Sequence, residues 1–262
     1  MKLAVSNIAW TLEQDEDVYK LLNEYGYEGV EIAPTRVFQE LPYDRVLEAG
    51  EWSKKIKREW GLNIPSMQSI WFGRQERIFG SDEERRFLVD YTKKAIVFAE
   101  TINCNNLVLG CPKNRNIFNK NDYDIGIKFF KELGDYASEH NTIIGMEANP
   151  TLYNTNYIND TGAALELIKE VDSKGFLLNL DLGTMIYNNE SVSQLIGNVK
   201  LINHVHISEP SLKPIEEREI HKDIKKILQD EGYNGYISIE MGKVDKIELL
   251  EDKMQYIRRI FG

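Results

Sequence analysis

The chain has 262 residues, of which 42% are hydrophobic and 28% charged, so it can bury a sizeable core and its composition excludes intrinsic disorder. Its 32 lysine and arginine residues are outnumbered by 42 aspartate and glutamate residues, and a net charge of −10 argues against a nucleic-acid partner. The sequence shows no signal peptide and no apolar run long enough to span a membrane, and it has only two cysteines. We therefore expect a cytoplasmic protein with no membrane partner.

Short apolar runs alternate with longer amphipathic segments along the whole chain. Strands are predicted at residues 3–7, 28–32, 62–67, 105–109, 143–147, 177–181, 201–207 and 236–240. Helices are predicted at residues 15–25, 44–60, 81–101, 123–140, 161–171, 191–198, 218–231 and 245–260. Eight such units of about 33 residues each are typical of a (β/α)₈ TIM barrel, and no linker-like run divides them. We therefore expect an α/β fold with a single domain over residues 1–262.

Local signals mark the ends of several predicted helices. Ser81 is followed three residues later by Glu84, which is the spacing of a capping box at a helix start. Gly26, Gly61 and Gly232 each follow a predicted helix, where a left-handed glycine commonly ends the helix.

The predicted loops differ in length on the two sides of the strands. Segments before strands are short, whereas long segments follow strands at residues 68–80, 110–121, 148–159 and 208–217. In α/β barrels the chemistry lies where the strands end and these long loops begin. The sequence therefore predicts the functional face at the carboxyl ends of the strands.

Four residues with metal-binding side chains lie at or near the ends of the last four predicted strands. They are Glu147, Asp181, His206 and Glu240, separated by 34, 25 and 34 residues. Each separation is close to the length of one βα unit, so the topology places all four at one end of the barrel.

Strand alternation tests whether these four side chains converge, because successive residues of a strand face opposite sides. The residues next to them are Met146, Leu180, Val205 and Ile239, which are apolar and should face the helices. The residues two positions earlier are Gly145, Asn179, His204 and Ser238, which are small or polar and suit a narrow barrel interior. All four candidate ligands are therefore expected to point inward.

Three carboxylates gathered at one point would repel each other and lose hydration, and a divalent cation removes both costs. Three carboxylates with one imidazole suit Mn²⁺ or Mg²⁺, with Zn²⁺ or Co²⁺ as alternatives. A single acidic residue at a strand end could instead cap a helix or form a salt bridge. Their shared parity on consecutive strands favours a site for one divalent metal.

Further residues on the same face are candidates for binding substrate. Asn149 could orient a substrate hydroxyl or stabilise its own loop, and Glu31 could bind hydroxyls or form a buried ion pair. Trp71 and Phe72 could cover an apolar sugar face or pack the loop. Six cations could attract a phosphate or carboxylate, or could be ordinary solvated charges: Arg74, Arg77, Lys113, Arg115, Lys213 and Lys243.

Two other histidines are expected to lie outside the metal site. His204 lies two residues before His206, deeper in the barrel, and a hydrogen-bonded core position is expected for it. His221 is expected on the surface of a helix.

Several motifs resemble those of the sugar phosphate isomerase/epimerase family, a group of xylose isomerase-like TIM barrels. They are Gly145-Met146-Glu147-Ala148-Asn149-Pro150, Asn179-Leu180-Asp181-Leu182-Gly183-Thr184, His204-Val205-His206-Ile207-Ser208-Glu209-Pro210 and Ile237-Ser238-Ile239-Glu240. The resemblance implies that Glu147, Asp181, His206 and Glu240 bind a divalent metal, and that Glu147 and Glu240 also form the acid/base pair. The chain departs from the family's ketose 3-epimerases, which have a histidine where this chain has Thr184 and an arginine where it has Leu212.

These observations predict a divalent-metal-dependent isomerase or epimerase of a sugar or sugar phosphate, acting by proton abstraction next to a carbonyl through an enediolate. A metal-dependent lyase or dehydratase of a polyol ketone of the inosose type is the close alternative, because enolate formation is the shared first step. A phosphoesterase like endonuclease IV is a weaker alternative, since it needs more metals and more nitrogen ligands than a chain with 4 histidines offers. A non-catalytic sugar-binding barrel is a further alternative. The expected partner is a small carbohydrate, and a homo-oligomer is compatible with the sequence.

Overall fold

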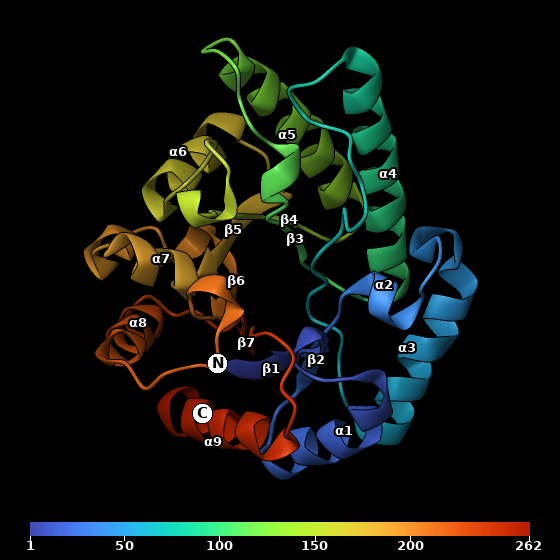
Figure 1. Ribbon diagram of the computed structural model, residues 1–262, viewed down its shortest axis with the longest axis vertical. Helices are drawn as coiled ribbons and strands as arrows, with labels where there is room; N and C mark the ends of the chain where they lie inside the picture. Colours follow the sequence, from blue (N-terminus) through green and yellow to red (C-terminus); the bar gives the residue numbers. More distant parts are fainter.

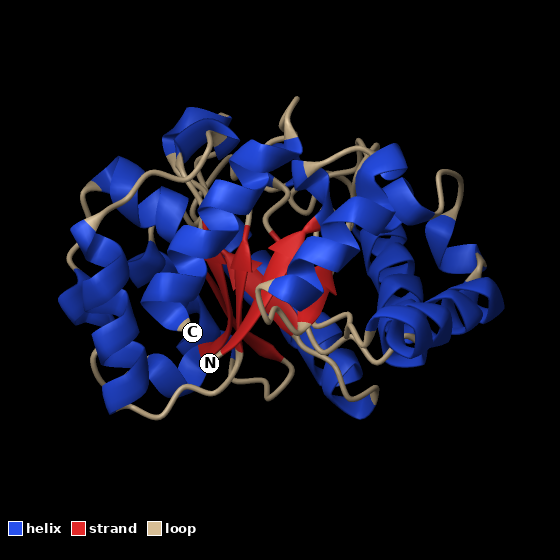
Figure 2. Ribbon diagram, turned by 90° about the horizontal axis from the view of Figure 1, so that it is seen from below, coloured by secondary structure: helices blue, strands red, loops and turns tan.

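The computed structural model describes residues 1–262. Seven parallel strands form one curled sheet in the order β2-β1-β7-β6-β5-β4-β3, enclosed by a ring of helices (Figures 1 and 2). The strands are β1 (Lys2–Ser6), β2 (Gly29–Glu31), β3 (Leu107–Leu109), β4 (Ile144–Glu147), β5 (Phe176–Asp181), β6 (Ile202–Ile207) and β7 (Tyr236–Ile239). The helices are α1 (Asp15–Glu24), α2 (Pro34–Val37), α3 (Val46–Trp60), α4 (Asp82–Thr101), α5 (Asp122–Glu139), α6 (Thr161–Val171), α7 (Leu182–Asn188), α8 (Glu219–Asp230) and α9 (Ile247–Phe261). None of these helices combines the length and the hydropathy needed to cross a membrane.

The strand predicted at residues 62–67 is present only as isolated bridges. Asn63 pairs with Gly29 of β2, and Met67 pairs with both Ile32 and Leu107, so this segment joins the two edges of the sheet and the circle of parallel segments closes. Pro65 explains the irregularity, because its nitrogen has no hydrogen to donate to a ladder. Seven of the eight predicted strands are therefore confirmed, and the eighth is an irregular segment in the expected place.

The helix predicted at residues 191–198 is wrong. That stretch contains only a short 3₁₀ turn at Val192–Leu195, and the helix of this unit is α7, which starts directly after β5. The reason is local: Asp181 is the N-cap residue of α7, and its Oδ2 accepts a hydrogen bond from the backbone nitrogen of Thr184 at 2.7 Å.

The other helix signals are confirmed. Ser81 and Glu84 form a reciprocal capping box at the start of α4. Gly26, Gly61 and Gly232 have φ angles of +67°, +70° and +77°, which is the left-handed region that favours glycine after a helix.

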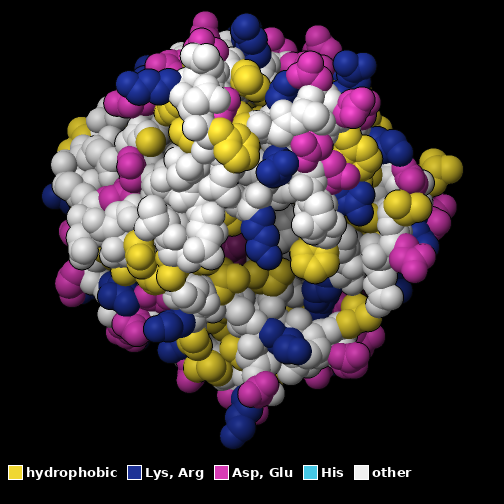
Figure 3. Space-filling model, turned by 45° about the horizontal axis from the view of Figure 1, so that its top comes forward, with side chains coloured by type: hydrophobic (Ala, Val, Ile, Leu, Met, Phe, Trp, Pro, Cys, Tyr) yellow, Lys and Arg dark blue, Asp and Glu magenta, His cyan; other side chains and the backbone are white.

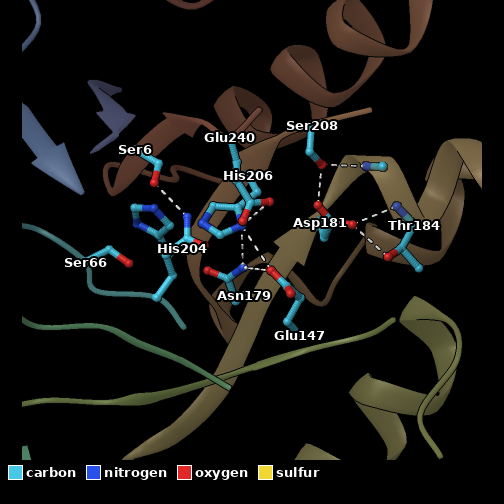
Figure 4. A network of polar contacts seen from close by, with 12 residues as sticks. Ser6, Ser66, Glu147, Asn179, Asp181, Thr184, His204, His206, Ser208 and Glu240 are labelled. Carbon is cyan, nitrogen blue, oxygen red and sulfur yellow. Dashed lines mark hydrogen bonds and ion pairs between the residues drawn. The ribbon is translucent and has the colours of Figure 1, made fainter. Parts of the chain in front are cut away.

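One hydrophobic cluster of buried side chains runs from Leu3 to Phe261 and fills the space between the sheet and the helices. The predicted outward residues Met146, Leu180, Val205 and Ile239 all belong to it. Their neighbours on the opposite parity are small or polar, and the polar ones among them point into the barrel (Figure 4). The alternation argument therefore describes the observed strands correctly.

The prediction of a surface position for His221 is wrong. His221 is fully buried on the inner stripe of α8, together with Ile224 and Leu228, and its Nδ1 lies 2.8 Å from the hydroxyl oxygen of Tyr256 in α9. Spacings of three and seven residues put these side chains on one helix face. That periodicity was available in the sequence.

Candidate metal centre and cavity

The four predicted ligands meet at the carboxyl end of the barrel. Glu147 and Asp181 are the last residues of β4 and β5, His206 is in β6, and Glu240 directly follows β7. One side-chain ligand atom from each of the four lies within 4.8 Å of the others (Figure 4). The register brings this about, because Asp181 pairs with His206 and His206 pairs with Ser238, two residues before Glu240.

His206 is the centre of this cluster, and its two ring nitrogens face different groups. Nδ1 lies 3.0 Å from Glu147 Oε1 and 3.2 Å from Glu240 Oε2. Nε2 lies 2.9 Å from Oε2 of Glu31, which is fully buried beneath the ring. A carboxylate on the far nitrogen fixes the orientation of the imidazole and directs Nδ1 toward the cluster.

Glu31 is thus in a buried ion pair, which is one of the two alternatives that the sequence leaves open. Its Oε2 also lies 3.1 Å from Nε2 of His204, and Gln68 Nε2 donates to its other oxygen at 3.0 Å. His204 is 1% exposed, in the core position expected for it. Glu31 is fully buried beneath the His206 ring and does not line the cavity of the site.

Asp181 both caps α7 and contributes to the cluster. Its Oδ2 accepts from the backbone nitrogen and the hydroxyl of Thr184, each at 2.7 Å, and Ser208 Oγ donates to its Oδ1 (Figure 4). The Thr184 hydroxyl is also 2.8 Å from the carbonyl oxygen of Ala148, at the end of the neighbouring strand. Because Thr184 is fully buried and donates both bonds, it holds the Asp181 carboxylate in one position.

Glu147 is held by a chain of polar contacts that begins at a buried arginine. Arg115 is 0% exposed and has no carboxylate partner, and its Nη2 donates to Asn149 Oδ1 at 2.8 Å. Asn149 Nδ2 in turn donates to Glu147 Oε2 at 3.1 Å, while Asn179 Nδ2 donates to Glu147 Oε1 at 2.9 Å. Both oxygens of this carboxylate are therefore oriented by amide donors.

The pKa values of the cluster reflect crowded, buried charge. Burial, followed by repulsion from Glu147 and Asp181, raises the pKa of Glu240 to about 7. Burial and the neighbouring Glu147 also raise the pKa of Asp181. Burial opposes the charged form of His206, but Glu31 and Glu240 outweigh it and raise its pKa well above the ordinary value. The cluster therefore favours positive charge at its centre.

The donor set fits a single divalent cation. Three carboxylates and one imidazole, each oriented by further hydrogen bonds, match the preferences of Mn²⁺ and Mg²⁺. The loop that follows β3 passes close to the cluster, and a Cβ on Gly110 would lie 2.6 Å from Glu147 Oε2. Only glycine at this position lets the carboxylate stay where it is. Glu147, Asp181, His206 and Glu240 would hold the cation.

The three carboxylates of the cluster line the floor of a cavity of about 480 Å³, a size suited to a small molecule. Asn149 and Trp71 line it, and Trp71 is 2% exposed with its Nε1 donating to Thr92 Oγ1 at 2.8 Å. Phe72 also lines the cavity and is 68% exposed. Lys213 is exposed and is not a lining residue, whereas its neighbour Leu212 is.

Some residues of this site were not singled out from the sequence. Ser208 holds Asp181, Tyr153 lines the cavity, and the buried Glu209 lines it while paired with Arg218 at 2.7 and 2.8 Å. Ser208 could have been found, since it lies two residues after His206 and shares its parity. No sequence signal marks the other two.

The fold and the site together define a class of protein: a parallel α/β barrel with metal-binding side chains at the carboxyl ends of its strands. The chain belongs to the xylose isomerase-like TIM barrel family, whose model matches residues 19–260. No curated protein sequence matches the chain.

Solved structures of similar fold include several carbohydrate epimerases and isomerases. The 3-keto-D-glucoside 4-epimerase of E. coli superposes with a TM-score of 0.79 at 20% identity, covering 99% of each chain. D-psicose 3-epimerase of Clostridium cellulolyticum H10 has a TM-score of 0.79 at 16% identity, covering 100% of this chain and 99% of the other. A sugar phosphate isomerase/epimerase of Parabacteroides distasonis has a TM-score of 0.71 at 16% identity, covering 98% and 93%.

Proposed function

We propose that the protein is a divalent-metal-dependent isomerase or epimerase of a sugar or sugar phosphate. The observation that carries the proposal is the convergence of Glu147, Asp181, His206 and Glu240, of which the three carboxylates line one cavity and the imidazole lies buried among them. Membership of a barrel family and the carbohydrate epimerases among the similar structures support the same class of substrate.

The proposed reaction moves a proton at a carbon next to a carbonyl. A divalent cation, if held by the cluster, would supply stabilisation for the negative charge that develops on the substrate oxygen. Glu147 and Glu240 come from different strands and approach His206 Nδ1 separately, so one carboxylate can take a proton and the other can return one. Asp181 and His206 mainly hold the metal, and Mn²⁺ or Mg²⁺ is proposed ahead of Zn²⁺ or Co²⁺.

The surroundings of Glu147 suit a group that must move a proton repeatedly. Asn149 and Asn179 present amide donors to its two oxygens, which keeps the carboxylate in one orientation. The side chain remains 11% exposed, on the cavity side. Asn149 itself lines the cavity and is proposed to contact a substrate hydroxyl as well.

The test is an NMR screen for deuterium incorporation from D₂O into ketoses, ketose phosphates and inosose-type ketones, with Mn²⁺ present. We expect exchange at the carbon next to the carbonyl, lost on treatment with a chelator. Glu147→Gln should lower the exchange rate by about 100–10,000-fold, the usual contribution of an acid/base group, while only weakening Mn²⁺ binding.

A matched control is Glu83→Gln, an exposed carboxylate in the first turn of α4, which should leave the rate unchanged. Full exchange in the Glu147→Gln variant would refute the catalytic role. A product that has lost water relative to the substrate would instead establish the dehydratase alternative.

A further inference from the structure

Two loops, residues 68–80 before α4 and residues 110–116 after β3, build part of the cavity wall, and Gly110 of the second loop lies against Glu147. Asn114 fastens them together: its Nδ2 lies 3.3 Å from the carbonyl oxygen of Arg74 and 2.8 Å from that of Glu76, and the backbone nitrogen of Ile78 donates to the carbonyl oxygen of Asn114 at 2.9 Å. Side chains of Arg74 and Lys113 therefore belong to one connected surface, although they are far apart in the sequence.

These two residues are the only members of the six predicted cations that line the cavity. Arg77 pairs with Glu84 at 3.4 Å and Arg115 is buried behind Asn149, whereas Lys213 and Lys243 are exposed outside the lining. Figure 3 shows acidic side chains at the bottom of a hollow with lysine or arginine side chains around its rim.

Neither Arg74 nor Lys113 has a carboxylate within 4.0 Å, although the chain has ten more acidic than basic side chains. No carboxylate of the protein therefore neutralises these two charges. An unpaired pair of cations at the edge of a cavity attracts an anion.

The guanidinium of Arg74 is also held in place. Its Cζ lies 5.3 Å from the ring centre of Tyr91 and 5.8 Å from that of Phe87, and its Nε is buried without a hydrogen-bond partner. Stacking on two aromatic rings removes side-chain freedom before any ligand binds, so less entropy is lost when a bidentate anion is bound.

We infer that Arg74 and Lys113 bind an anionic group, a phosphate or a carboxylate, at the end of the substrate remote from its reacting carbonyl. This inference rests on the proposed function for the position of the carbonyl at the carboxylate floor. It follows from the two kinds of charge that line the cavity, because the three carboxylates at the floor repel an anion that the unpaired cations of Arg74 and Lys113 attract. The substrate class is therefore an acidic polyhydroxy carbonyl compound rather than a neutral sugar.

The experiment compares deuterium exchange for ketose phosphates, keto-uronates and the matching neutral ketoses. We expect the anionic compounds to have the lower KM. Arg74→Met and Lys113→Met should each raise that KM by about 10–100-fold, the value of one charge-assisted hydrogen bond, without changing KM for neutral ketoses. Lys120→Met, an exposed lysine of the same loop region outside the cavity, is the control and should change neither value.

Which anion gives the lower KM identifies the group as phosphate or carboxylate. The inference would be overturned if neutral and anionic compounds had equal KM values. It would also be overturned if Arg74→Met and Lys113→Met raised KM equally for both kinds of compound. Calorimetric binding of inorganic phosphate, weakened at least about tenfold by Arg74→Met, tests the anion site without turnover. Arg74-dependent phosphate binding without exchange into any sugar would contradict the proposed function alone, whereas exchange into neutral ketoses with no lower KM for either the phosphates or the uronates would contradict only this inference.

Discussion

His206 and His221 are both 0% exposed, yet their surroundings drive their pKa values in opposite directions. His206, at the mouth of the barrel, lies among the carboxylates of Glu31, Glu147 and Glu240, which raise its pKa well above the ordinary value. His221, between α8 and α9, has the Tyr256 hydroxyl as its one hydrogen-bond partner, and burial, with a smaller contribution from Arg218, lowers its pKa to about 4.

The comparison separates two uses of burial in one molecule. In the outer layer the buried histidine is neutral, with one ring nitrogen on a neutral hydroxyl and the other, Nε2, without a hydrogen-bond partner. At the barrel mouth, charged groups are gathered at a cost in desolvation that only opposite charge offsets. A site that gathers charge in this way is a candidate for chemistry, and three substitutions test the distinction.

The largest effect is expected for Asp181→Asn. The amide oxygen can still accept from the Thr184 backbone nitrogen and cap α7, but the negative charge is lost. Mn²⁺ affinity should fall by more than about 100-fold, beyond the loss usual for a residue that only supports a ligand. Calorimetry gives the affinity, and an unchanged melting temperature without added metal shows that the cap survives. Equal Mn²⁺ affinities would mean that Asp181 is a capping residue only.

A smaller effect is expected for Arg115→Met, which breaks the contact chain to Glu147. Without the guanidinium, Asn149 is free to turn, and kcat for proton exchange should fall by about 30-fold, with a smaller rise in KM because Asn149 is also proposed to contact a substrate hydroxyl. The unfolding free energy should not fall, since a buried charge without a carboxylate partner is removed. Arg115→Lys should restore part of kcat; a loss of stability with normal kcat would show that the arginine serves packing.

The smallest effect is expected from pH on the outer layer. Because the pKa of His221 is lower in the folded protein, its contribution is intact above about pH 6.5 and is lost as pH falls toward 4, where the unfolded chain binds the extra proton. Between pH 7 and 5.5 this costs about 1 kcal/mol of unfolding free energy. His221→Gln should remove that part of the pH dependence in urea titrations. An unchanged pH dependence would show that the histidine is not held neutral.

Periodicity and strand parity were sufficient to predict most of the architecture and the convergence of the four ligands, because both depend on local backbone geometry. The irregularity of the segment around Pro65 and the start of α7 directly after β5 were not predicted. Both depend on tertiary structure: the first on how the sheet closes, the second on Asp181 acting as the N-cap of α7. Ser208 was within reach of the parity argument, whereas the role of Arg115 follows from its contact with Asn149 of another loop, which one sequence does not reveal.

The double hydrogen bond from Thr184 to Asp181 has a practical consequence for spectroscopy. The backbone amide of Thr184 donates to a carboxylate oxygen of the cluster, yet Thr184 itself is not among the residues that line the cavity. Its amide resonance is therefore a built-in reporter of the charge on Asp181, and it allows occupancy of the centre to be followed in the unaltered protein without a substrate.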